Sequence, residues 1–81
     1  MPKLRVLSAA DVLRILGEFG FRELTRRGSH IKLRRTVASG ASQTLTVPYH
    51  KEIDRGTLYA VFRQACRYIP ESELRPRFFT E

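Results

Sequence analysis

Apolar residues recur at helical spacing in two segments of the chain, and polar and apolar residues alternate in the stretch between them. The first helical segment begins at Ser8, which forms a capping-box pattern with Asp11, and it ends at Gly20. Its apolar stripe consists of Val12, Ile15, Leu16 and Phe19. The second segment begins after Asp54, a typical helix-capping residue, and its stripe consists of Leu58, Val61, Phe62, Ala65 and Ile69. The pattern therefore predicts two amphipathic helices.

The stretch between the helices predicts three strands. Residues 21–26 are β-compatible but alternate imperfectly, residues 30–35 alternate cleanly, and residues 44–47 form a third short run that a proline ends. We expect a tight turn at residues 27–29 and a polar hairpin loop at residues 36–43. Short connections of this kind favour antiparallel pairing of neighbouring strands.

The C-terminal part of the chain is less regular. Residues 70–73 predict the first turn of a short third helix, because a proline is followed by two acidic residues. Residues 75–81 are basic and aromatic, and their pattern assigns no element. Phe78 and Phe79 are expected to close the core against the first helix, and an exposed docking element is the alternative. The predicted order is α-β-β-β-α with a short C-terminal helical turn, an α+β fold in one domain of residues 1–81.

Two helices can cover only one face of a three-stranded antiparallel sheet. Strand alternation assigns the apolar positions to the covered face, namely Ile31, Leu33, Leu45 and Val47. The opposite face is then open to solvent, and it carries His30, Lys32, Arg34, Thr44 and Thr46.

Composition and charge narrow the classes of partner. The 81 residues carry a formal net charge of +7, and most of the 15 basic residues are arginines. Because the planar guanidinium suits phosphate, we expect a polyanionic partner, nucleic acid above all. The lone Cys66 excludes a disulfide framework and indicates a reducing, cytoplasmic setting. We expect neither a signal peptide nor membrane association, and a domain this small leaves no room for a buried small-molecule cofactor.

His30 is the candidate catalytic residue. It follows Gly28 and Ser29 directly, and basic residues surround it. RNA cleavage needs a base near the ribose 2′-hydroxyl or an acid near the leaving oxygen, together with cations that offset charge on phosphorus. Those groups act without a metal, and the sequence shows no acidic cluster to hold one. On these residues alone, an ordinary surface histidine remains the alternative.

The surrounding residues have expected roles as well. The arginines at positions 22, 26, 27, 34 and 35 form a patch that tracks phosphates or a plain solvated face. The expected RNA contacts within and beside this patch are Arg26, Arg27, Gly28, Ser29, Lys32 and Arg34. Ser29 is interpreted as a turn residue rather than a nucleophile. Gly28 is interpreted as a position that needs a backbone conformation or a close approach that a side chain would prevent. His50 is a second acid–base group, a substrate contact, or a loop residue that bonds to the backbone near the helix entry.

Several short motifs occur in a recognisable order: Arg26-Arg27-Gly28-Ser29-His30, Val47-Pro48-Tyr49-His50, Asp54-Arg55-Gly56-Thr57-Leu58 and Arg63-Gln64-Ala65. Over residues 8–68 this combination resembles the HicA family, small toxins of bacterial and archaeal toxin–antitoxin pairs. The resemblance implies a fold like that of double-stranded-RNA-binding domains. It also implies a ribosome-independent mRNA interferase that acts through the histidine of Gly-Ser-His and is silenced by a HicB antitoxin. Ile31 departs from the family, because many members have a second polar or histidine residue there.

A second function class has the same architecture: a non-catalytic RNA-binding module whose basic sheet face only holds the RNA backbone. A binder of double-stranded RNA is expected to carry a lysine cluster at the start of its last helix. Residues 54–57 contain a single arginine instead. This difference favours the enzyme.

Overall fold

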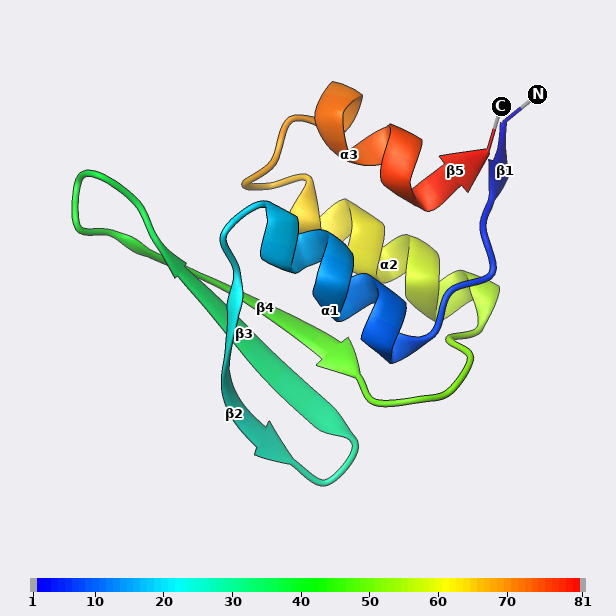
Figure 1. The fold of residues 1–81 in the computed structure, drawn as a ribbon, viewed down its shortest axis with the longest axis horizontal. Helices are drawn as coiled ribbons and strands as arrows, with labels where there is room; N and C mark the ends of the chain where they lie inside the picture. The colour runs from blue at the N-terminus through cyan, green and yellow to red at the C-terminus, as the bar shows by residue number, and fades with distance from the viewer. Residues whose placement is uncertain (1, 81) are drawn as a thin grey trace.

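The three central strands form one antiparallel sheet in the order β2-β3-β4 (Figure 1). The computed structural model describes residues 2–80. Strand β2 spans Arg22–Arg27, β3 spans His30–Thr36 and β4 spans Ser42–Pro48. The hairpin loop between β3 and β4 is therefore shorter than the sequence predicts, because both strands extend into the polar segment and pair there.

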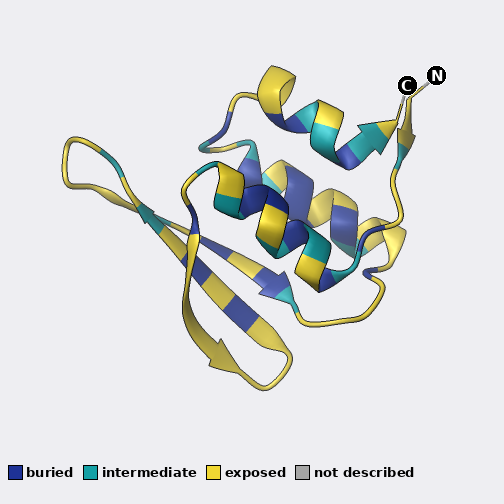
Figure 2. Cartoon of the chain, viewed as in Figure 1, coloured by how far each residue is buried: buried dark blue, intermediate teal, exposed yellow. Residues whose placement is uncertain are grey.

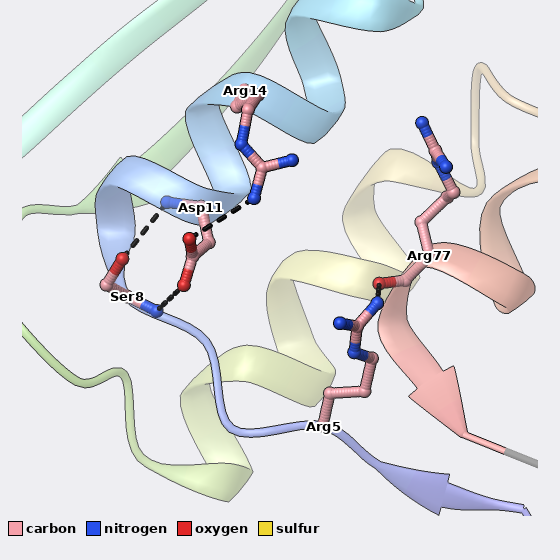
Figure 3. A network of polar contacts seen from close by, with 5 residues as sticks. All are labelled: Arg5, Ser8, Asp11, Arg14 and Arg77. Atoms are coloured by element: carbon pink, nitrogen blue, oxygen red, sulfur yellow. Dashed lines mark hydrogen bonds and ion pairs between the residues drawn. The ribbon is translucent and has the colours of Figure 1, made fainter.

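The two predicted amphipathic helices are α1, Ala9–Glu18, and α2, Arg55–Ala65. Ser8 caps α1 in a complete capping box with Asp11, whose carboxylate also contacts Arg14 (Figure 3). The Asp54 carboxylate accepts a hydrogen bond from the Thr57 backbone N–H and caps α2. Both caps confirm the starts read from the sequence, and a left-handed Gly20 with φ of 95° follows the end of α1, as expected.

Both helices cover the same face of the sheet. Figure 2 shows buried and exposed positions alternating along β3, and the apolar side chains of that strand and of β4 are buried beneath the helices. The sequence assigned these residues correctly: Ile31, Leu33, Leu45 and Val47. Strand β2 is exposed along its whole length, because it lies beyond the helices. The α+β fold with an open sheet face is thus confirmed.

A third layer covers the helices. Helix α3, Glu71–Phe78, is followed by β5, Phe79–Thr80, which pairs antiparallel with the N-terminal strand β1, Lys3–Leu4. The two described ends of the chain consequently lie side by side (Figure 1). The Arg5 guanidinium donates to the carbonyl oxygen of Arg77 at 3.3 Å (Figure 3), and the Arg77 side chain forms an ion pair with Glu18 of α1.

The C-terminal segment is more ordered than the sequence predicts. Its helix runs well beyond residue 73 with Pro76 inside it, and Leu74 and Phe78 are fully buried. Phe78 belongs to the buried core and Phe79 packs against it. The rings of both residues contact Phe62 of α2, at ring-centroid distances of 5.4 and 5.1 Å. No helix among residues 2–80 is long and apolar enough to cross a membrane.

Candidate functional site

His30 is the first residue of the central strand, and it lies between two neighbours in the sheet. Arg27 of β2 is its partner on one side and Pro48 of β4 on the other. The turn that leads into His30 contains Gly28, whose φ of 57° is left-handed, so a glycine suits this position. The carbonyl oxygen of Ser29 accepts a hydrogen bond of 2.7 Å from the Tyr49 backbone N–H, which ties the turn to the end of β4.

Two further rows of side chains continue the open face. Lys32 pairs with Thr25 and Thr46, and Arg34 pairs with Arg22 and Thr44. A shallow hollow of about 550 Å³ lies over the first two rows. Its lining residues are Thr25, Arg26, Arg27, His30, Lys32 and Thr46. The structure therefore gathers His30, Lys32, Arg26 and Arg27 around one hollow. Thr46, which the sequence placed on the open face, also lines it, and so does Thr25, which the sequence did not single out.

The two-residue turn Gly28-Ser29 decides which arginine faces His30. It leaves Arg27 opposite His30 and Arg26 opposite Ile31, so that Arg27 lies on the open face and Arg26 on the face of Ile31. The pairing register then shifts between Thr25, opposite Lys32, and Glu23, opposite Leu33, so that Leu24 has no partner and forms a β-bulge.

Arg26 is held by neighbours within the protein. Its guanidinium forms an ion pair of 3.0 Å with Glu23 and lies 4.3 Å from the centroid of the Tyr49 ring. The hydrogen bond from Arg26 lowers the pKa of the Glu23 carboxyl, and the same bond raises the pKa of Arg26. Tyr49 is 52% exposed, so the Arg26–Tyr49 pair stands at the margin of the hollow as a cation with an aromatic ring.

Some of the other basic side chains are exposed and unpaired within the described chain, and others are hydrogen-bonded within the protein. Within residues 2–80, Arg27, Lys32 and Arg34 form no ion pair, and all three are exposed. Arg22 donates instead to the carbonyl oxygens of Gly17 and Phe21. Arg35 is directed away from the open face and joins three segments of the fold through four hydrogen bonds. The five-arginine patch of the sequence analysis is therefore not one surface.

His50 does not line the hollow. Its carbonyl oxygen accepts a 2.9 Å hydrogen bond from the Ala9 N–H at the start of α1, and its imidazole is exposed. The pKa of the Asp54 carboxyl is lowered mainly by hydrogen bonds from Thr57, and the His50 charge adds a small contribution. His50 thus lies toward the start of α2, on the far side of Tyr49 from the turn.

Two further observations concern the thiol of the chain and its capacity to hold a metal ion. Cys66 is half-buried after the end of α2, and burial raises the pKa of its thiol. Residues 2–80 contain no group of three or more histidine, cysteine, aspartate or glutamate side chains that could hold a metal ion.

A comparison with protein families gives a match over most of the chain. The family model described as HicA toxin of bacterial toxin-antitoxin matches residues 9–65, from the first residue of α1 to the last residue of α2. The terminal strands and α3 lie outside this match. Searches of curated proteins and of solved structures give no match.

Proposed function

Because this chain belongs to the HicA toxin family of bacterial toxin–antitoxin systems, we propose that it is an endoribonuclease, an mRNA interferase, with His30 as its catalytic residue. The observation that carries this proposal is the position of His30. The imidazole stands exposed at the head of the central strand, opposite Arg27, in a hollow that it shares with Lys32. A phosphate in this hollow would meet an acid–base group and cations together.

The proposed reaction is attack of the ribose 2′-oxygen on the adjacent phosphorus. The 2′-hydroxyl loses its proton, the new bond to phosphorus forms, and the bond from phosphorus to the 5′-oxygen breaks as that oxygen takes up a proton. His30 serves as the general base or the general acid of this sequence, since imidazole exchanges protons near neutral pH. Arg27 and Lys32 offset the negative charge that builds up on the phosphoryl oxygens. These residues supply the chemistry without a metal ion.

The remaining contacts hold the RNA backbone. Arg34 continues the cationic row beyond Lys32, and Arg26 borders the hollow with its guanidinium over Tyr49. Gly28 and Ser29 form the turn beside His30, where no side chain of Gly28 obstructs an approaching phosphate. Because the hollow is open rather than a closed pocket, it suits a single strand of RNA whose 2′-hydroxyl can reach the imidazole.

The natural inhibitor is proposed to be a HicB-type antitoxin that covers the His30 face. The exposed cations Arg27, Lys32 and Arg34 make this face a target for an acidic partner, which electrostatic attraction would steer onto it. An antitoxin bound there would exclude RNA from the hollow.

The experiment compares wild-type and His30→Ala protein on a labelled mRNA fragment in excess EDTA. We expect the wild type to cleave and the variant to lose about 10²–10⁴ in rate, the usual effect of removing a positioned acid–base group. The melting temperature should stay unchanged, because the side chain is exposed. His50→Ala is the matched histidine control and should retain cleavage.

Several results would contradict the proposal. Continued cleavage by His30→Ala, or loss of activity that follows a collapsed melting transition, would show that His30 is not catalytic. Loss of wild-type cleavage in EDTA would refute the metal-free mechanism. If the wild type binds RNA and never cleaves it, the protein is the non-catalytic RNA-binding module.

A further inference from the structure

A second cationic surface runs along the exposed side of α2. Four residues occur there at successive i, i+4 positions, which places them on one side of a helix: Arg55, Tyr59, Arg63 and Arg67, the last in the turn that follows the helix. We call these four residues the α2 stripe. All four are exposed, and within residues 2–80 none of the three arginines forms an ion pair. Within the described chain, no carboxylate therefore pairs with these charges.

The stripe combines cations with a supported aromatic ring. Tyr59 is 44% exposed, its ring stacks on Phe62 at 6.2 Å between centroids, and the Arg63 guanidinium lies 5.9 Å from its centroid. Successive positions of the stripe are about 6 Å apart along the helix axis, a spacing comparable to that of phosphates on an extended strand. Proteins that bind single-stranded nucleic acid combine cations that follow the backbone with aromatic rings that stack on bases.

The stripe adjoins the His30 hollow across the outer edge of β4. The Gln64 side chain of α2 accepts from the Thr46 backbone N–H at 2.9 Å and donates to the Thr46 carbonyl oxygen at 3.4 Å. Thr46 lines the His30 hollow, and Gln64 lines a hollow of about 710 Å³ with Arg63 and Arg67. The contact between the Gln64 side chain and the Thr46 backbone thus joins a residue that lines one hollow to a residue that lines the other.

We propose that the α2 stripe binds the same RNA strand that His30 cleaves, by contacting phosphates outside the scissile one after the strand crosses β4 at Thr46 and Gln64. This inference rests on the proposed endoribonuclease function. An acidic protein could use the same cations, but continuity with the His30 hollow favours RNA, since one extended strand can occupy both surfaces.

The experiment measures binding of a fluorescently labelled 12-nucleotide single-stranded RNA at several salt concentrations, in the His30→Ala background so that the RNA stays intact. The test variant carries Arg63→Ala and Arg67→Ala. The matched control carries Arg5→Ala and Arg14→Ala, which removes the same charge from residues that line none of these hollows. For single strands each phosphate contact contributes about 0.7 to the slope of log affinity against log salt. We therefore expect the slope to fall by about 1.4 in the test variant and to stay unchanged in the control.

A second readout uses enzymes that retain His30. Because the stripe contacts RNA equally before and during the reaction, the test variant should raise KM and leave kcat unchanged. If the parent protein binds no RNA, the proposed function itself fails. If the parent binds and cleaves RNA while the test variant keeps its slope and KM, only the role of the stripe is refuted. If the test variant keeps its salt slope and its KM but no longer co-purifies with the antitoxin, the stripe binds protein rather than RNA and the proposal is overturned.

Discussion

Replacing Arg35 by alanine should destabilise the protein strongly, although its neighbour Arg34 can be replaced at little cost. The Arg35 guanidinium donates to the carbonyl oxygen of Phe19 at 2.9 Å and to that of Tyr68 at 3.0 Å, and it also donates twice to the Gln43 amide oxygen. It lies 4.7 Å from the centroid of the Phe21 ring. One side chain thus joins β3 to the end of α1 and to the turn after α2.

The expected loss of unfolding free energy follows from these contacts. A hydrogen bond from a charged donor contributes about 1.5–3 kcal/mol, and two carbonyl oxygens lose such a donor in Arg35→Ala. Because the site is only half-buried, we take the lower end, about 3 kcal/mol for the two bonds together. A domain of this size has a total stability of about 4–12 kcal/mol. At roughly 4–8 °C per kcal/mol, the melting temperature should fall by about 12–24 °C.

The assay is thermal and urea unfolding followed by circular dichroism, with Arg34→Ala as the control. Arg34 is exposed and forms no ion pair within residues 2–80, so its removal should change stability by no more than about 0.5 kcal/mol. Arg34→Ala should instead lower the salt slope of RNA binding by about 0.7, an effect that folded Arg35→Ala protein should not show. Equal stabilities of the two variants would refute the structural role assigned to Arg35.

Three further predictions concern the cap of α1, its dependence on pH, and the inhibited complex. Ser8→Ala should cost about 1 kcal/mol of unfolding free energy, measured by urea denaturation. The pKa of Asp11 is lowered mainly by the hydrogen bond that its carboxylate accepts from the Ser8 backbone N–H. The stability that Asp11 adds is therefore present above its ordinary pKa and lost as the pH falls below about 4. An Asp11→Asn variant whose stability is as sensitive to acid as that of the wild type would contradict this prediction. In the complex with its antitoxin, hydrogen exchange should be slowed mainly over residues 26–34, and protection confined to the helices would instead indicate inhibition from a distance.

Local patterns were sufficient to predict the helices and the covered face of the sheet. Ser8 and Asp54 cap helices through contacts within four residues, and the alternation around Ile31 and Leu33 needs no knowledge of distant partners. The strands β1 and β5 have only two residues each, too few to show a period, and they exist because the ends of the chain meet. The helical continuation through Pro76 depends likewise on the burial of Phe78.

The candidate site was predictable in kind but not in detail. The order Gly28-Ser29-His30 before an alternating strand indicated an exposed histidine in basic surroundings, and the structure places it so. Which arginine stands opposite His30 depends on the turn being two residues long rather than the three that the sequence predicts, and the bulge at Leu24 is a property of strand pairing that one strand does not encode alone. Arg34 and Arg35 are chemically identical neighbours, and only the three-dimensional positions of Phe19 and Tyr68 separate a free cation from a structural one.

The contact between Gln64 and Thr46 also bears on how this protein behaves when it accumulates alone. Unpaired strand edges are templates on which other chains add, and a three-stranded sheet has two of them. At the β4 edge the Gln64 amide occupies the backbone donor and acceptor of Thr46, as a neighbouring strand would. At the β2 edge, the bulge and the charged side chains interrupt a flat pairing surface. Both edges are therefore partly protected against strand addition, and we expect this protection to limit aggregation through the sheet when the toxin is free of its antitoxin.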